Sequence, residues 1–393
     1  MCVESNWAQI FERASSKNPA VVVARRRIGM ESIARKLIPN FRDMAERSPS
    51  NSQENASRAA IARIRSKPTP DEATVTKWAE AIVGGDMRVL AQGISLVESE
   101  RTADRQAAEW LLNQLLPHAG KSLRIGITGV PGAGKSTLIE AVGMAWNARG
   151  HRVAVLAVDP SSRRTGGSVL GDKTRMEQLA RTPGTFIRPS PAGATLGGVS
   201  RATGEAITLC EAAGFDRIIV ETVGVGQSET EVRNLTDFFV LLLIAGAGDE
   251  LQGIKRGVLE FADLLLINKA DGDNIERAKQ AAARYARGLE MLSPPPSGES
   301  CVVQTLSALE GHGVPEFLDT VSARETSLRE SGQFEAMRAN QRAAFLRHML
   351  REQALRFVEE QPGFESAWAA AQQSVRDGKS TAYSAIRPFF TAP

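Results

Sequence analysis

The periodicity of hydrophobic and polar positions changes along the chain. Between residues 71 and 118, apolar residues recur at helical spacing and predict two amphipathic helices, the second of which stops at Pro117. Short apolar runs of strand length then alternate with segments able to form helices. The predicted strands are 123–128, 153–158, 217–221, 238–244, 264–267 and 301–305. Because strands that are apolar throughout are typical of parallel sheets covered on both faces, this pattern predicts an α/β fold.

The same pattern divides the chain into four parts. Residues 1–70 are rich in arginine and end in polar stretches with Pro and Ser, which predicts a poorly ordered basic extension. A helical region at 71–118 and an α/β domain at 119–325 follow, and residues 326–393 are predicted to form a helical C-terminal segment. An organelle transit peptide is the alternative for the first part. Acidic residues interrupt it, however, and such peptides are poor in acids.

Composition and charge narrow the possible functions. A formal net charge of +3 is too small to argue for nucleic-acid binding. The three cysteines lie far apart, so neither a disulfide framework nor a zinc site is predicted. No apolar run in the sequence approaches the about 18 residues that a membrane span needs. We therefore expect a protein of the reducing cytoplasm, with the mitochondrial matrix as the alternative.

A glycine-rich loop follows the first predicted strand and carries the clearest chemistry. Its residues fit the pattern G-x-x-x-x-G-K-[ST] between a strand and a helix, the context that this motif requires. Glycines let backbone N–H groups turn toward a phosphate, Lys135 places a positive charge against the β- and γ-oxygens, and Ser136 offers a hydroxyl to Mg²⁺. A strand–helix turn that binds nothing is the alternative. The predicted nucleotide-binding residues are Gly129, Val130, Pro131, Gly132, Ala133, Gly134, Lys135, Ser136 and Thr137.

A second motif predicts which base the nucleotide carries. Asn268, Lys269 and Asp271 form N-K-x-D directly after a buried strand. Asp271 can accept hydrogen bonds from guanine N1–H and from its 2-amino group, whereas adenine offers neither donor. The stem of Lys269 would lie along the base plane, and Asn268 would tie this loop to the phosphate loop. A later loop resembles the Ser-Ala-x element whose backbone N–H contacts guanine O6, and it comprises Ser307, Ala308 and Leu309. The predicted ligands are therefore GTP and GDP.

The metal site is predicted from carboxylates near strand ends. Asp159 ends the second predicted strand, Asp172 lies in the polar loop after it, and Glu221 ends the third. Mg²⁺ takes oxygen ligands in near-octahedral geometry and keeps several waters. The Ser136 hydroxyl, two phosphate oxygens and waters held by these carboxylates would supply that shell. Together with Lys135, the three carboxylates are the predicted catalytic residues.

The stretch after the third predicted strand resembles a GTPase switch with two departures. Glu221 stands where the γ-phosphate sensor normally has an aspartate, and Gly224 closes the tetrad. Gln227 does not follow that glycine directly, as the water-orienting glutamine of Ras-like enzymes does. No arginine finger can be assigned from the sequence. We therefore expect slow intrinsic hydrolysis that a partner stimulates.

Several motifs together resemble those of one family: GVPGAGKST, AVDPSS, TGGSVLGDKTRM, ETVGVGQSE and NKAD. They are similar to the motifs of the MeaB/ArgK-type G-protein chaperones, which serve adenosylcobalamin-dependent methylmalonyl-CoA mutase, from about residue 75 to at least 325. The resemblance implies a SIMIBI-class P-loop domain with N-terminal and C-terminal helical extensions, the latter an arm for homodimerisation. It also implies that GTP gates cofactor delivery to this mutase or a related acyl-CoA mutase, and that the chaperone protects or reactivates that enzyme.

The resemblance further implies a third switch, at residues 246–257, that couples the nucleotide to the mutase. Its polar residues are Asp249, Glu250, Gln252 and Lys255. A charged surface loop is the alternative for this stretch. No nucleic-acid or membrane partner is expected.

Other functions are compatible with parts of the sequence. A nickel or cobalt metallochaperone GTPase of the same structural class would need Cys and His ligands at short spacing, and here these residues are isolated. A GTP-dependent interaction switch for another partner agrees with the nucleotide motifs. A signal-recognition-type targeting protein would need a methionine-rich helical domain, but the nine methionines are dispersed.

The C-terminal pattern leaves two possibilities open. An apolar stripe is predicted within 331–363, and it comprises Phe334, Met337, Phe345, Met349, Leu355 and Val358. This stripe would either serve the dimer arm or pack on the chain's own α/β domain.

Overall fold

The computed structural model describes residues 68–159, 176–191, 198–222, 228–245, 256–290 and 301–390. The chain divides into two compact units, Met1–Pro68 and Thr69–Pro393, and the fold is that of the second unit. The basic extension predicted for the N-terminal part lies outside the described residues, apart from its last three positions.

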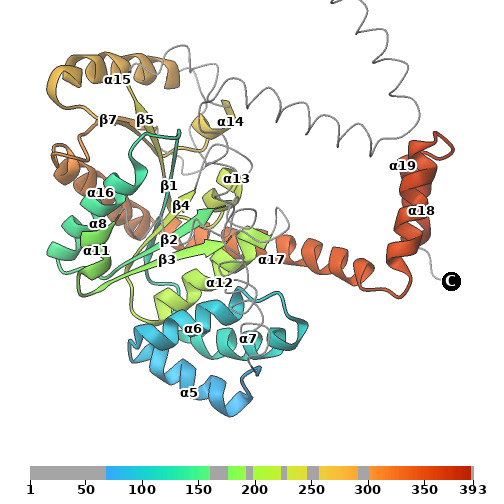
Figure 1. Ribbon diagram of the computed structural model, residues 1–393. Helices are drawn as coiled ribbons and strands as arrows, with labels where there is room; N and C mark the ends of the chain where they lie inside the picture. Colours follow the sequence, from blue (N-terminus) through green and yellow to red (C-terminus); the bar gives the residue numbers. More distant parts are fainter. Residues whose placement is uncertain are drawn as a thin grey trace, which may run out of the picture. The chain divides into compact units, whose positions relative to one another are not determined.

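A seven-stranded parallel sheet forms the centre of this unit (Figure 1). Its spatial order is β3-β2-β4-β1-β5-β6-β7. The strands are β1 (Leu123–Gly129), β2 (Val153–Asp159), β3 (Thr185–Pro191), β4 (Arg217–Thr222), β5 (Phe238–Ile244), β6 (Leu264–Asn268) and β7 (Val302–Thr305). Strands β4 and β6 are buried along their whole length, as expected where helices cover both faces of a sheet. The prediction of an α/β fold with a parallel central sheet is confirmed.

Strand β3 is absent from the strands that the sequence predicts. It contains Arg188, Pro189 and Pro191, which interrupt any apolar run. In the structure it pairs only with β2, at the edge of the sheet. Proline is tolerated there because one side of an edge strand makes no ladder hydrogen bonds.

Helices pack on both faces of the sheet (Figure 1). On one face lie α8 (Lys135–Ala148), α11 (Glu177–Arg181) and α16 (Val314–Glu330), which form one apolar cluster with the strands. The other face is covered by α12 (Gly198–Ala212), α15 (Ile275–Leu289) and the N-terminal helices. The remaining short elements are α13 (Ser228–Arg233), α14 (Arg256–Leu259), and the 3-10 turns η1 (Leu116–His118), η2 (Gly272–Asn274) and η3 (Arg387–Phe390).

The N-terminal helical region contains three helices, one more than the sequence pattern predicts. They are α5 (Glu72–Val83), α6 (Met87–Val97) and α7 (Thr102–Leu115). Asp71 and Asp86 cap the first two by accepting hydrogen bonds from backbone N–H groups of the first turn. Helix α5 buries Val75, Ala79 and Ile82, which stand at positions i, i+4 and i+7 and therefore share one face of the helix.

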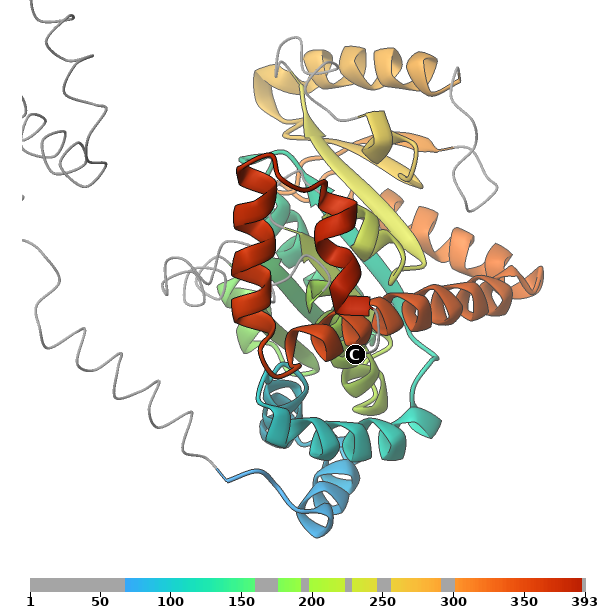
Figure 2. The ribbon, with the colours of Figure 1, turned by 90° about the vertical axis from the view of Figure 1, so that its right-hand side faces the viewer.

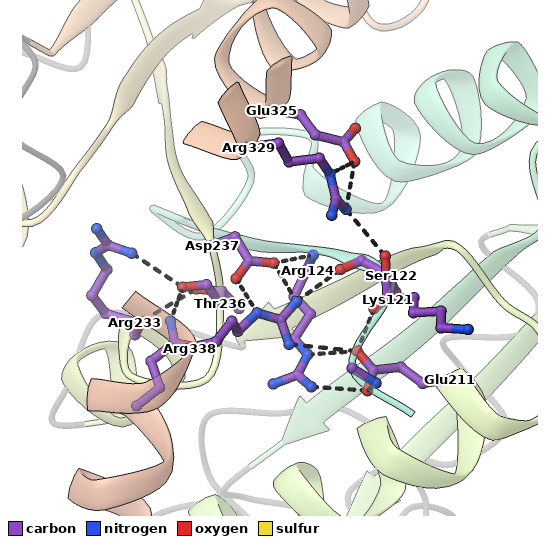
Figure 3. Close-up of polar contacts among 12 residues, drawn as sticks. Lys121, Ser122, Arg124, Glu211, Arg233, Thr236, Asp237, Glu325, Arg329 and Arg338 are labelled. Carbon is purple, nitrogen blue, oxygen red and sulfur yellow. Dashed lines mark hydrogen bonds and ion pairs between the residues drawn. The ribbon is translucent and has the colours of Figure 1, made fainter. Parts of the chain in front are cut away.

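A buried network of charges anchors the C-terminal helix α17 (Gln333–Glu359) at the amino end of the sheet (Figure 3). Arg338 donates to both carboxylate oxygens of Asp237 at 2.5 and 2.6 Å and to the Ser122 carbonyl at 2.7 Å. Its guanidinium also lies 3.5 Å from Glu211, which Arg124 binds through two hydrogen bonds of 2.9 Å. Burial opposes ionisation of Glu211, but Arg124, Arg338 and the Ser122 hydroxyl outweigh it and lower its pKa. The first turns of α17 are therefore fixed to the sheet.

Beyond this anchor, α17 has one face on the body and one exposed face. Phe334 is buried and Phe345 packs against α12, so part of the predicted stripe does pack on the chain's own α/β domain. Leu355 of the stripe is instead 52% exposed, together with Leu346, Leu350 and Phe357. The face of α17 that contacts the α/β domain contains apolar, polar and charged residues. A prediction based on apolar residues alone therefore includes some that lie on the exposed face.

Two further helices follow α17 at the C-terminal end. Helices α18 (Phe364–Arg376) and α19 (Ala382–Ile386) contact each other and lie side by side in Figure 2. An aromatic cluster of Phe364, Trp368 and Phe389 holds this hairpin together, with ring centroids 5.4–6.0 Å apart.

Candidate functional site

The glycine-rich loop lies at the carboxyl end of β1, where the strand order of the sheet reverses. Strand β1 is flanked by β4 on one side and β5 on the other. In open parallel sheets, ligands bind at such a reversal because the loops that leave neighbouring strands diverge there. The loop then leads directly into α8, whose N-terminal end favours an anion.

Two glycines of this loop cannot be replaced without moving their neighbours. A Cβ on Gly129 would lie 2.3 Å from the Leu242 carbonyl oxygen of β5. Gly134 has a φ of 91°, and a Cβ there would lie 2.7 Å from the Asn268 side chain. The glycines therefore serve the close approach of the loop to β5 and to the Asn268 loop, as well as the left-handed backbone.

Lys135 curls back from the start of α8 over the loop. Its ammonium donates to the Gly129 carbonyl at 2.9 Å and to the Val130 carbonyl at 3.5 Å. Burial lowers the pKa of Lys135, and the Glu221 carboxylate offsets part of this effect. The ammonium is thus a partly desolvated cation beside a glycine-rich loop at the N-terminal end of α8, a place where phosphates commonly bind.

The ends of β1 and β4 bring the other described candidates to the same edge. Glu221 is 4% exposed, and the residue after it, Thr222, donates from its hydroxyl to that of Thr128 at 2.8 Å. Ser136 lies in the first turn of α8 next to Lys135 and is partly exposed. Within the described ranges, no group of three or more His, Cys, Asp and Glu side chains is suited to hold a metal ion. A hydroxyl and one carboxylate nevertheless fit Mg²⁺ that shares its shell with phosphates and water.

Other predicted residues of the site lie outside the described residues. These are Asp172, Gly224, Gln227, Asp249, Glu250, Gln252 and Lys255. For Asp159 the structure describes the backbone, which ends β2 next to β4, and not the side chain.

The N-K-x-D residues connect two loops to the phosphate loop. The Asn268 side chain is buried; it donates to the Ala133 carbonyl at 2.7 Å and accepts from the Ala308 N–H at 3.0 Å. Lys269 has a φ of 59°, a left-handed conformation that non-glycine residues rarely adopt outside functional sites. The link that the sequence predicts between Asn268 and the phosphate loop is present in this geometry.

The Asp271 carboxylate is oriented by a residue whose role the sequence does not predict. The Ser307 hydroxyl donates to Asp271 at 2.5 Å and itself accepts from the Glu310 N–H at 3.1 Å. The Ser307 side chain is fully buried, so its hydroxyl holds the Asp271 carboxylate from the interior of the protein. The sequence predicts that a backbone N–H of the Ser-Ala-x loop contacts guanine O6. The Ser307 and Ala308 N–H groups are bonded within the protein, to His312 and Asn268.

This site and sheet define the chain as a P-loop GTPase. The family model for the methylmalonyl-CoA mutase-associated GTPase MeaB matches residues 90–362, and the chain belongs to this family. None of the described helices has the length and apolar character needed to cross a membrane.

Curated relatives and a solved structure agree with this assignment. A Mycobacterium tuberculosis protein named "Probable GTPase" is 50% identical over 79% of this chain and 93% of its own length. GTPase ArgK of Escherichia coli is 43% identical over 81% of this chain and 96% of its own length. The mitochondrial methylmalonic aciduria type A homolog of Mus musculus is 44% identical over 76% of this chain and 74% of its own length. The crystal structure of a LAO/AO transport system kinase superposes with a TM-score of 0.66 at 37% identity, over 82% of this chain and 98% of that one.

Proposed function

We propose that this GTPase is a chaperone of an adenosylcobalamin-dependent acyl-CoA mutase of the methylmalonyl-CoA mutase type. In this role it would use GTP binding and hydrolysis to gate cofactor delivery and to protect or reactivate the mutase. The name of the family and that of the mouse relative support this class of partner. Membership of the family favours this role over metal delivery to another enzyme. The cytoplasm is the proposed location.

The nucleotide would occupy the carboxyl edge of the sheet between β1 and β6. Lys135 would exchange its bonds to the Gly129 and Val130 carbonyls for phosphate oxygens, which are stronger acceptors because they are charged. Asp271, held by Ser307, would accept the two guanine donors. The observation that carries the proposed nucleotide binding is the position of the Asn268 side chain. Its hydrogen bonds to Ala133 and Ala308 connect the phosphate loop to the two loops that would bind the guanine base.

Ser136 and Glu221 would hold the metal end of the nucleotide. Mg²⁺ bound there would neutralise charge on the β- and γ-phosphates. Ser136 would supply a direct hydroxyl ligand. Glu221 would orient a water of the metal shell, since it is buried at the end of β4 and interacts electrostatically with Lys135. Asp159 and Asp172 are proposed to act on the same shell, and residues 246–257 to couple the nucleotide to the mutase.

The C-terminal helices are proposed to form a homodimer. Leu346, Leu350 and Phe357 of α17 are more than two-thirds exposed, although they are large and apolar. Large exposed apolar residues gathered on one helix are typical of protein interfaces. A second chain of this protein would cover them.

The proposed role is tested by the rate of GTP hydrolysis with and without a purified mutase. The isolated protein should turn over well below the about 10 s⁻¹ typical of enzymes, and a cognate mutase should raise the rate at least about tenfold. A matched acyl-CoA enzyme that uses no cobalamin serves as the control. Equal rates with methylmalonyl-, isobutyryl- and hydroxyisobutyryl-type mutases and with this control would overturn the chaperone assignment.

A further inference from the structure

The loop of residues 268–274, which we refer to as the base loop, contains a left-handed residue that is not a glycine. Among the non-glycine residues that the structure describes, only Lys269 has a positive φ, at 59°. A residue with a Cβ is less stable in this conformation than in the right-handed or extended ones, so other contacts must hold it there. These contacts decide where the stem of Lys269 and the carboxylate of Asp271 point.

The peptide group between Lys269 and Ala270 is held at both ends. Its N–H, which belongs to Ala270, donates to the Leu306 carbonyl at 3.0 Å. Its C=O, which belongs to Lys269, accepts from the side-chain amide of Asn274 at 2.6 Å. Only the amide nitrogen of the Asn274 side chain can donate this bond. The peptide group therefore cannot rotate without losing a hydrogen bond on one side or the other.

Asn274 also bonds the backbone of Asp271. Its N–H donates to the Asp271 carbonyl at 2.9 Å, across the 3-10 turn η2. The Asp271 carboxylate is held separately, by the Ser307 hydroxyl. The backbone and the side chain of Asp271 are therefore fixed by two different residues, and neither of them belongs to the N-K-x-D motif.

The Asn274 side chain does not serve the helix that it precedes. Asn274 is the N-cap residue of α15, a helix that the structure describes in full, but its side chain makes no cap bond. Asparagine is preferred at this position because its side-chain oxygen usually accepts from a backbone N–H of the first turn. Here the backbone of Asn274 is right-handed, with a φ of −92° and a ψ of −7°, and the amide donates back to the base loop. The side chain thus stabilises the base loop and not the start of α15.

We propose that Asn274 is a positioning residue for guanine recognition, whose amide holds the Lys269–Ala270 peptide in its left-handed turn and so directs Lys269 and Asp271 toward the base. Asn274 acts through these residues and does not itself touch the nucleotide. Without the amide, the loop would adopt conformations in which the Asp271 carboxylate no longer meets both guanine donors. This role deepens the proposed nucleotide binding and rests on it.

Calorimetric titration of the full-length protein with GTP and with ATP tests this role. Asn274→Ala should lower GTP affinity about tenfold, the loss expected for one hydrogen bond together with the release of a strained backbone. ATP affinity should change by less than about twofold, because adenine offers Asp271 no donor. A purely structural defect would instead lower both affinities together. Asp273→Ala, at the exposed neighbouring position of the same turn, is the control and should leave both affinities unchanged.

Asn274→Asp separates the lost donor from any effect on α15. Its side chain has nearly the same shape, and a carboxylate is favourable at the N-terminus of a helix, but it cannot donate to the Lys269 carbonyl. The added negative charge repels all triphosphates alike, so the ratio of GTP to ATP affinity isolates the positioning effect. This ratio should fall by the same factor as in Asn274→Ala.

A double-mutant cycle shows whether Asn274 acts through Asp271. In the Asp271→Asn background, Asn274→Ala should lower GTP affinity by at most about twofold, because the carboxylate that it positions is already lost. Unchanged affinity and base preference in both Asn274 variants, or an undiminished loss in the Asp271→Asn background, would overturn the proposal. A parent protein that does not distinguish GTP from ATP would overturn the proposed base site together with this role, so the two failures are distinguishable.

Discussion

At the amino end of the central sheet, Arg338 and Asp237 are buried and bonded to each other. At the carboxyl end, Lys135 is only partly buried, and backbone carbonyls hold its ammonium. Both places contain charges that folding has taken out of water. At the amino end, the positive charge comes from α17 and the negative charge from the segment just before β5, and the two form an ion pair with each other. At the carboxyl end, a cation lies over a glycine-rich loop at the N-terminal end of α8, and the described residues place only backbone carbonyls in hydrogen-bond contact with it. The first arrangement serves stability, and the second serves an anionic ligand.

Removing the guanidinium at the amino end is expected to have the largest effect. Arg338→Ala leaves Asp237 and Glu211 buried with fewer partners, and the free energy of unfolding should fall by about 3–5 kcal/mol. Denaturant unfolding measures this loss. The affinity of the folded fraction for GTP should remain that of the parent. Arg342→Ala, on an exposed position of α17, is the control and should change stability little.

The corresponding change at the carboxyl end should do the reverse. In the proposed binding mode Lys135→Ala would remove at least two charge-assisted hydrogen bonds to phosphate, so GTP affinity should fall by at least about 100-fold. The free energy of unfolding should fall by less than it does in Arg338→Ala, because Lys135 is only partly buried and its ammonium is bonded to backbone carbonyls, although the buried Glu221 carboxylate loses a nearby positive charge. Lys77→Ala on α5 provides the exposed control. A large loss of stability in Lys135→Ala, with unchanged GTP binding, would contradict the proposed difference between the two ends of the sheet.

Glu205 of α12 lies between these extremes, since its side chain is 13% exposed and Arg201 binds its carboxylate at 2.8 Å. With the pKa of Glu205 raised to about 7, the folded state binds this proton more tightly than the unfolded state does. The free energy of unfolding should therefore fall as pH rises through about 7. Glu205→Gln should reduce this fall by about 1–3 kcal/mol between about pH 5 and about pH 8, measured by thermal unfolding. Glu359→Gln, which removes an exposed carboxylate from α17, is the control, and an identical pH profile in both variants would argue against Glu205 as the titrating group.

The smallest effect is expected from the loss of the Ser307 hydroxyl, which bonds the Asp271 carboxylate. Ser307→Ala leaves Asp271 in place but frees its carboxylate to rotate, so GTP affinity should fall about tenfold. The preference for GTP over ATP should fall with it, because Asp271 is the group that we propose distinguishes the bases. Ser366→Ala on α18 serves as a matched control. A variant that binds GTP as tightly as the parent would mean that the Ser307 hydroxyl has no part in positioning.

The two ends of the sheet also differ in how far they can be predicted from the sequence. Each motif at the carboxyl end is contiguous, so Lys135 and Asp271 can be identified from local spacing alone. The amino-end network joins Arg338 to Asp237 across 101 positions and Arg124 to Glu211 across 87, and only the folded sheet brings them together.

The same limit explains the smaller differences. Edge strand β3 lacks the apolar run of the inner strands. The docked face of α17 alternates Phe334 and Phe345 with Arg338, Gln341 and other polar residues, which no apolar period can trace. The role of the Ser307 hydroxyl depends on its distance to Asp271, and only the structure provides this.

Calorimetric titration of the purified protein with GTP, GDP and ATP in the presence of Mg²⁺ tests the central claim most directly. Both guanine nucleotides should bind, and ATP should bind at least about 100-fold more weakly, because adenine offers Asp271 neither of its donors. Asp271→Asn should remove this preference, whereas Asp273→Asn, two residues away and exposed, should keep it. Equal binding of GTP and ATP, or no binding of guanine nucleotides, would contradict the account.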